Sequence, residues 1–330
     1  MLVPILPKKS FQDIPKKEKF EAPPLATKVK IHPSFIKNKS TSVFQSNLHS
    51  KNFPYIGKIN QNSSILNKTY ISKPIVSAKA WVVYDVITDS YIDGHRECDK
   101  REIASLTKIM TCIVSIEEIV NSKRSFDTSI EISYTAASID GTTAGLCPKD
   151  TLKIIDLLYA LMLPSGNDAS LALAEIIGAS YGIGAEIENF VMYMNRTAQR
   201  LGLKHTKFTN PHGMSITLNY STAADLARLT AYCMKNRLFR KIVSTSNYTC
   251  GIVNGNILRK VDWINTNRLL TQGFNGVKTG YTPTAGPCLC CSVNDGNINI
   301  IIVILNARYR HLRWVEASRL LAWASSAVSI

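Results

Sequence analysis

Residues 104–110 read ASLTKIM, with a serine and a lysine three positions apart at the start of an apolar stretch. Residues at this spacing share one face of a helix, so the hydroxyl of Ser105 and the amine of Lys108 are predicted to be neighbours. A serine hydroxyl is a weak nucleophile until a base removes its proton. A lysine can be that base only if burial or nearby positive charge lowers its pKa well below about 10.4. The stretch therefore predicts an activated serine.

The same residues also fit an ordinary helix start, with Ser105 near the cap and Lys108 extended into solvent. Two further motifs favour the chemical interpretation. The SGN triplet at 165–167 lies in a break between two helical patterns, where polar side chains can reach a cleft. The KTG triplet at 278–280 lies on a predicted strand, and its glycine permits close approach of a ligand. Taken alone, these two triplets would be a capped turn and an exposed edge-strand lysine.

The sequence around these motifs predicts alternating β and α segments. Two β-rich runs within 78–95 predict a hairpin. Residues 151–178 predict two helices separated by a break at 164–166, with Asn167 or Asp168 as the cap of the second. The other predicted elements are helices from near Ser105, over 186–201, from the Thr222–Asp225 capping box onward and over 308–326, and strands over 276–282, 286–294 and 297–307.

Early strands, central helices, and late strands followed by a helix predict an α+β fold. The first and last strands would share one antiparallel sheet flanked by helices, and the central segments would form a second, mostly helical lobe. Residues 76–330 are long enough to form such a folded domain. Residues 1–75 are rich in Lys, Asn, Ser and Pro without periodicity, which predicts a disordered basic N-terminal extension.

The net charge of +15 is concentrated in that extension. Residues 1–75 contain 13 lysines, no arginine and 3 acidic residues, a net charge of +10, which leaves +5 for the other 255 residues. The folded part has no basic stripe with interleaved aromatic residues. Nucleic-acid binding is therefore not the main function that the sequence predicts.

Other common classes of site and segment find little support. The eight cysteines have no histidine cluster beside them, and Cys288, Cys290 and Cys291 lie in an apolar strand-like run, so no zinc site is predicted. No apolar run approaches the roughly 18 residues of a transmembrane helix. The N-terminal sequence MLVPILPKK places its charge after its apolar stretch, the wrong order for a signal peptide. The compartment stays open.

Six segments in the order ASLTKIMT, LMLPSGNDAS, TNPHG, YSTAADLA, TNRLL and GVKTGYTPTAGPCL carry a family resemblance. Together they resemble the D-alanyl-D-alanine carboxypeptidases among the low-molecular-mass penicillin-binding proteins. Those enzymes are serine peptidases with the β-lactamase/transpeptidase-like fold, and related enzymes share the SxxK and KTG motifs. The resemblance covers about residues 78–326, so 76–330 would be the catalytic domain.

The resemblance implies roles for the first two motifs. Ser105 would be the acyl-enzyme nucleophile, and Lys108 would be its general base. Ser165 would relay a proton toward the leaving amine, and Asn167 would hydrogen-bond Lys108 and the substrate amide. His212 is not needed for this chemistry, and we interpret it as a turn residue.

The third motif would bind the substrate. Lys278 and Thr279 would hold the terminal carboxylate, and the charge of Lys278 would help to lower the pKa of the general base. Gly280 would leave space for the substrate strand. The backbone N–H groups of Ser105 and Tyr281 would form an oxyanion hole, a feature worth about 3–4 kcal/mol. The resemblance implies no metal and no cofactor.

The implied activity is cleavage of the terminal D-alanine from peptidoglycan stem peptides, with β-lactams as inhibitors. Family members often add a signal peptide, a C-terminal β-rich domain and a membrane anchor. Because the sequence stops at the last helix of the catalytic domain, attachment by that anchor is not expected.

Two alternatives stay open. A β-lactamase-like hydrolase would need a deacylating glutamate, and Glu175 lacks the usual local pattern. A catalytically idle protein that binds peptidoglycan or β-lactams would not need all three motifs intact.

Overall fold

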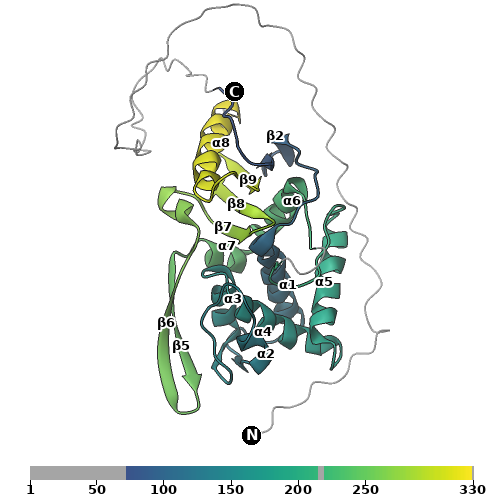
Figure 1. The fold of residues 1–330 in the computed structure, drawn as a ribbon, viewed down its shortest axis with the longest axis vertical. Helices are drawn as coiled ribbons and strands as arrows, with labels where there is room; N and C mark the ends of the chain where they lie inside the picture. The colour runs from purple at the N-terminus through teal and green to yellow at the C-terminus, as the bar shows by residue number, and fades with distance from the viewer. Residues whose placement is uncertain (1–71, 215–218, 329–330) are drawn as a thin grey trace, which may run out of the picture. The chain divides into compact units, whose positions relative to one another are not determined.

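The computed structural model describes residues 72–214 and 219–328, and the predicted extension lies almost wholly outside them. The elements of the described chain form two sheets and a set of helices (Figure 1). The first sheet contains β1 (Ala80–Asp85), β2 (Ser90–His95), β7 (Val277–Thr282), β8 (Gly286–Asn294) and β9 (Asn299–Leu305). The second contains β3 (Ser129–Glu131), β4 (Thr151–Lys153), β5 (Asn247–Asn254) and β6 (Ile257–Ile264).

Helices fill the middle of the chain and end it. The α-helices are α1 (Thr107–Asn121), α2 (Tyr134–Ala137), α3 (Ile154–Met162), α4 (Asn167–Gly178), α5 (Glu186–Arg200), α6 (Ala223–Cys233), α7 (Arg237–Val243) and α8 (Leu312–Val328). Three 3-10 turns accompany them: η1 (Ala104–Leu106), η2 (Ala179–Tyr181) and η3 (Arg268–Gln272).

The first sheet joins the two ends of the domain. Its strand order is β2-β1-β9-β8-β7, with antiparallel pairing throughout. Val82 of β1 lies opposite Val303 of β9, although the two residues are far apart in sequence. The prediction that early and late strands share one antiparallel sheet is therefore confirmed, and β7 forms one edge of that sheet.

The two faces of this sheet pack in two different cores. Successive side chains of a strand point to opposite faces, so neighbouring residues of one strand belong to different cores. Val82 and Val303 belong to the core shared with α1 and α6. Val83 and Ile302, their neighbours along the strands, pack instead in a second core with α8. This arrangement explains why these strands read as nearly continuous apolar runs, and it fixes the orientation of β7 at the site.

The helical lobe surrounds α1. Eleven of the fifteen residues of α1 are buried, and the helix lies among α3, α4 and α5 in Figure 1. No single helix in the described part of the chain is both long and apolar enough to cross a membrane. Only α4 and α5 taken together reach that length and hydrophobicity, and they are bent by 88° at the break between them. The predicted mostly helical lobe is confirmed.

The second sheet was not predicted. Strands β5 and β6 form a long hairpin that extends beside the helices (Figure 1), and β4 joins its edge through Thr151 and Val253. Residues 151–153, predicted as helix, are therefore a strand, and α3 begins at Ile154. The prediction of a final helix from 308 is also early, because α8 begins at Leu312.

Close packing of α4 against α5 gives a test of the fold. A Cβ on Gly178, the last residue of α4, would lie 1.8 Å from the carbonyl oxygen of Glu186. Alanine normally favours a helix over glycine, but here the backbone would have to move. We expect Gly178→Ala to lower the free energy of unfolding by about 1–3 kcal/mol, measured by urea denaturation.

The matched control is Gly251→Ala in β5, where the new Cβ would meet Leu258 at an ordinary 3.5 Å. That variant should be nearly as stable as the parent protein. If Gly178→Ala were also as stable as the parent, the packing described for α4 and α5 would be wrong.

Candidate active site

The serine of the first motif lies on η1 and not on an α-helix, which corrects the prediction. This turn runs directly into α1, so Ser105 and Lys108 remain one turn apart. Ala104 has a φ of 47°, a left-handed conformation that costs about 1–3 kcal/mol for a residue other than glycine. The half-buried Ser105 therefore lies in a strained turn that leads directly into the largely buried helix α1.

Two glycines allow other segments to approach this turn. A Cβ on Gly280 would lie 3.0 Å from the carbonyl oxygen of Ile103 and 3.2 Å from the backbone nitrogen of Ser105. A Cβ on Gly213 would lie only 2.0 Å from the carbonyl oxygen of Ala104. Strand β7 and the TNPHG turn (209–213) thus pack closely against the backbone of 103–105.

The side chain of Lys108 is fully buried and ends between three oxygen atoms. Its Nζ lies 3.0 Å from Ser105 Oγ, 2.7 Å from Asn167 Oδ1 and 2.9 Å from the carbonyl oxygen of His212. The alternative of a solvent-exposed lysine is therefore excluded. The hydrogen bond that the family resemblance implies between Asn167 and Lys108 is present.

The chemistry of these three oxygens determines how a neutral amine would sit. A neutral amine offers two N–H donors and one lone pair. The Asn167 oxygen and the His212 carbonyl can only accept, so they would take both donors. A hydroxyl can donate, so the lone pair would point at the Ser105 hydroxyl. In its neutral form, Lys108 is therefore arranged to receive the serine proton.

Burial and charge favour that neutral form. The pKa of Lys108 lies well below its usual value of 10.5, first because of burial and then because of the positive charge of Lys278, while Asp168 opposes the shift. Burial, together with the charge of Arg313, also lowers the pKa of Lys278, to about 7. Arg313 of α8, Lys278 of β7 and Lys108 of α1 thus form a spatial series, in which the charge of each residue lowers the pKa of the next.

The second motif lies where α4 begins. Asn167 is the first residue of α4, and its side-chain amide donates to the carbonyl of Asp140 at 2.7 Å. Ser165 has a φ of 69°, and its buried Oγ makes no hydrogen bond among the described residues. The structure therefore brings Ser165 into the SGN turn but gives it no hydrogen bond to either lysine of the site.

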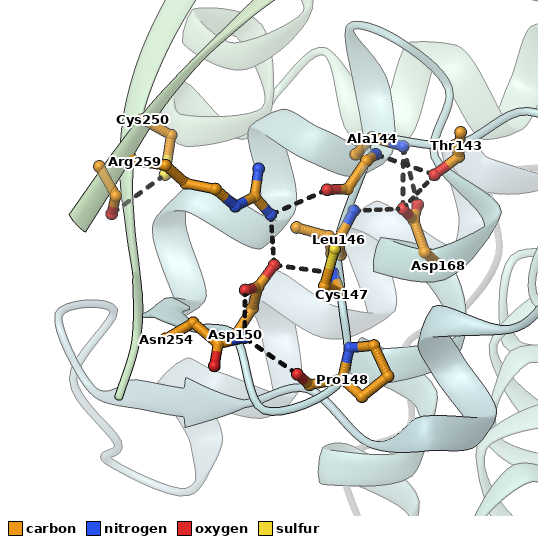
Figure 2. A network of polar contacts seen from close by, with 12 residues as sticks. Thr143, Ala144, Leu146, Cys147, Pro148, Asp150, Asp168, Cys250, Asn254 and Arg259 are labelled. Atoms are coloured by element: carbon orange, nitrogen blue, oxygen red, sulfur yellow. Dashed lines mark hydrogen bonds and ion pairs between the residues drawn. The ribbon is translucent and has the colours of Figure 1, made fainter. Parts of the chain in front are cut away.

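Neither Asn167 nor Asp168 caps α4 through its side chain, which corrects the prediction. The carboxylate of Asp168 instead holds the loop before α3. It accepts from the backbone N–H groups of Ala144 and Leu146 and from the hydroxyl of Thr143 (Figure 2). Asp168 is thus a support for the loop that contacts the SGN turn.

The same loop is tied to the β5–β6 hairpin on its other side. Figure 2 shows the fully buried carboxylate of Asp150 bonded to Arg259 of β6 and to Asn254 of β5. Arg259 also donates to the carbonyl of Gly145 at 2.9 Å. The unpredicted hairpin therefore helps to fix the loop behind the second motif.

The third motif lies on β7 at the edge of the first sheet. The Lys278 side chain is 1% exposed and donates to the carbonyl of Thr279 at 3.0 Å, which excludes an exposed edge-strand lysine. The hydroxyl of Thr279 lies 2.8 Å from that of Thr266. Tyr281 remains 43% exposed at the end of the motif. The first two motifs contact Lys108 through Ser105 and Asn167, and the third motif lies close enough for Lys278 to lower the pKa of Lys108.

Sequence reasoning missed Arg313. This residue is in the first turn of α8, 92% buried by its neighbours, and its guanidinium donates to the carbonyls of Gly280 and Cys288. It supports β7 from behind and lowers the pKa of Lys278. No local motif marks it, since its role depends on the packing of α8 against the sheet.

Sequence reasoning also underestimated the TNPHG turn. The carbonyl of Pro211 accepts from Thr111 on α1 and Ser170 on α4, both at 2.6 Å. The next carbonyl, of His212, accepts from Lys108. Burial, aided by the charge of Lys108, lowers the pKa of the His212 imidazole to about 4, so this ring is neutral near pH 7. The turn therefore positions the lysine through its backbone.

Glu175 lies away from these groups. It is eight residues beyond Asn167 on α4, a rise of about 12 Å along the helix. Its carboxylate accepts from Ser133, the N-cap of α2, at 2.9 Å. Among the described residues, no three His, Cys, Asp or Glu side chains form a group that could hold a metal ion.

The antiparallel sheet joined to a helical lobe is the β-lactamase/transpeptidase-like fold. The crystal structure of the Streptomyces K15 DD-transpeptidase has a TM-score of 0.73 and 31% identity over 77% of this chain and 98% of that one. The D-alanyl-D-alanine carboxypeptidase DacD from Francisella tularensis has a TM-score of 0.70 and 27% identity over 81% of this chain and 74% of that one.

The chain belongs to the D-alanyl-D-alanine carboxypeptidase family, whose sequence model matches residues 67–309. It is 33% identical over 251 residues to the carboxypeptidase DacF of Bacillus subtilis, covering 76% of this chain and 62% of that protein. It is 32% identical over 262 residues to the carboxypeptidase of Streptomyces sp. strain K15, covering 77% of this chain and 89% of that protein. The chain therefore spans less than two thirds of the length of DacF.

The charge of Lys278 gives a test of the site electrostatics. A neutral residue at 278 removes a like charge, so the pKa of Lys108 should rise. Because only the neutral amine can accept a proton, the acidic limb of the pH profile should move to higher pH in Lys278→Met. The measurement is the rate of labelling by a fluorescent penicillin as a function of pH.

Lys260→Met on the exposed face of β6 removes the same charge far from the site and should leave the limb in place. An unchanged limb in Lys278→Met, or a shift to lower pH, would contradict the electrostatic coupling.

Proposed function

We propose that residues 76–330 are a serine-type D-Ala-D-Ala carboxypeptidase domain that acts on peptidoglycan stem peptides. The observation that carries the proposal is the position of the buried Lys108 amine, 3.0 Å from Ser105 Oγ, with its two other contacts to oxygens that can only accept. This arrangement suits a base for serine. The relatives named as carboxypeptidases support the substrate class.

The first chemical step is acylation of the serine. Lys108 takes the proton of Ser105 as Oγ attacks the carbonyl carbon of the penultimate D-alanine. The negative charge that develops on the carbonyl oxygen would be stabilised by the backbone N–H groups of Ser105 and Tyr281. When the amide bond breaks, the leaving D-alanine amine receives the proton that Lys108 took from Ser105. We propose that the hydroxyl of Ser165, which has no hydrogen-bond partner among the described residues, relays this proton.

The second step releases the acyl group. Water attacks the ester carbonyl as Lys108 takes one of its protons, and Lys108 returns that proton to the Ser105 oxygen as the ester bond breaks. The shortened peptide and free D-alanine are the products. The base is thus regenerated in its neutral form, without a metal or cofactor in any step.

Charge at the third motif suits the terminal carboxylate of the substrate. Lys278 of β7 and Arg313 of α8 are both buried, and burial lowers the pKa of each. A carboxylate beside Thr279 would compensate these charges and favour the protonated form of Lys278. We propose that this carboxylate selects peptides cleaved at their C-terminal residue.

The β-lactamase-like alternative is less well supported because Glu175 is bonded to Ser133, about 12 Å along α4 from Asn167. We expect the penicilloyl-enzyme to persist, and Glu175→Gln to leave its rate of hydrolysis unchanged within about twofold. Intact-protein mass spectrometry after removal of free penicillin follows this rate. A marked slowing in the Glu175→Gln variant would instead favour the β-lactamase.

The direct test of the proposed function is release of D-alanine from diacetyl-L-Lys-D-Ala-D-Ala. Ser105→Ala should lower kcat/KM by at least about 10⁴-fold, as expected for loss of a serine nucleophile. Ser122→Ala, at the exposed C-cap of α1, removes a matched hydroxyl and should retain full activity. If the unchanged protein bound the peptide but released no D-alanine, the idle-binder alternative would replace this proposal.

A further inference from the structure

A groove lies beside the C-terminal end of β7, outside the three motifs. Its volume is about 450 Å³, and it is bounded by the β7–β8 turn and by the segment between β9 and α8. Tyr281, the residue that follows the KTG motif, is part of its lining. The groove therefore begins where the proposed oxyanion hole ends.

The groove carries positive charge that no carboxylate neutralises. Lys79, Arg308 and Arg310 line it, and all three side chains are exposed. None of them takes part in an ion pair within residues 72–214 and 219–328. The lining contains no acidic residue, and the nearby carboxylate of Glu102 accepts from the hydroxyl of Thr284 at the groove. The lining thus offers an anion three cationic side chains, and the carboxylate of Glu102 at its edge already accepts a hydrogen bond from Thr284.

Aromatic rings hold the two arginines in place. The guanidinium carbon of Arg310 lies 3.8 Å from the centroid of the Tyr281 ring, and that of Arg308 lies 5.5 Å from the Tyr309 ring. Tyr309 in turn stacks on His311. A stacked guanidinium keeps its N–H groups free for a carboxylate, and it loses less conformational freedom when the carboxylate binds.

The direction of the substrate leads it toward this groove, if the proposed function holds. With the terminal carboxylate at Lys278 and Thr279 and the oxyanion at the backbone N–H of Tyr281, the substrate follows β7 in the direction of increasing residue number. The part of the stem peptide before the scissile bond then continues toward 282–284. One extended residue spans about 3.5 Å, so residues two or three positions upstream reach the groove.

We propose that this groove is a subsite for a carboxylate on the stem peptide, upstream of the D-Ala-D-Ala end. Arg308 and Arg310 form charge-assisted hydrogen bonds to that carboxylate, and Lys79 adds to the local positive potential. The inference rests on the proposed function and names the preferred substrate class. These substrates are stem peptides with a free carboxylate on the second residue upstream of the D-Ala-D-Ala end.

Three peptides test the proposal through kcat/KM for D-alanine release. The first is acetyl-γ-D-Glu-L-Lys(acetyl)-D-Ala-D-Ala with its free α-carboxylate, the second is the same peptide with that group amidated, and the third is diacetyl-L-Lys-D-Ala-D-Ala. We expect the unchanged protein to prefer the acid over the amide by about three- to tenfold at low salt. The preference should shrink in about 0.5 M NaCl because the charges are exposed to solvent.

The variants Arg308→Gln and Arg310→Gln should each reduce the ratio of acid to amide, a readout that a general loss of activity does not change. Arg319→Gln, exposed on α8, removes the same charge and should keep the full ratio. Equal kcat/KM for acid and amide in the unchanged protein, or a full preference in Arg310→Gln, would overturn the subsite. No release from any of the three peptides would overturn the proposed function, and this inference with it.

Discussion

Burying the amine of Lys108 is the constraint around which the domain is organised. An isolated buried ammonium is costly by several kcal/mol, and a buried amine without partners is also unfavourable. Here the amine is provided with Asn167 Oδ1 and the His212 carbonyl as fixed acceptors, and with the Ser105 hydroxyl as its third neighbour. Each partner comes from a separate segment: the start of α4, the TNPHG turn and η1. The structures that hold those segments, including Asp168 and its loop, therefore serve the same amine.

A second theme is the series of positive charges behind the site. Arg313 lowers the pKa of Lys278, and Lys278 lowers the pKa of Lys108, so repulsion adds to the effect of burial at each position. The free protein thus holds excess positive charge in a dry environment. A bound carboxylate would compensate that charge next to the serine. This coupling links substrate binding to the protonation state of the catalytic residues, which a mere cluster of polar side chains would not do.

Much of the fold could be predicted because its signals are local. Strands β1, β8 and β9 of the first sheet are buried on both faces, so their apolar runs are plain, and β8 matches residues 286–294 as predicted. The β5–β6 hairpin was missed although Asn254 and Gly255 form a typical turn signal, because exposed polar residues interrupt its apolar pattern. Arg313 and the His212 carbonyl could not be predicted, since their roles arise only when α8 and the TNPHG turn pack against β7 and α1. The side-chain cap predicted for α4 failed because Asn167 and Asp168 bond to Lys108 and to a distant loop instead.

The central claim is that the Lys108 amine loses its proton at a pH well below that of an ordinary lysine. The most direct measurement is an NMR titration of the side-chain Cε–Hε signals of ¹³C-labelled lysine, with the Lys108 signal assigned by its loss in Lys108→Met. A titration midpoint well below the usual value of 10.5 is the predicted result, because burial and the charge of Lys278 both lower the pKa of this amine. A midpoint at or above that usual value would contradict the account, because the lysine would then be charged and unable to accept the proton of Ser105.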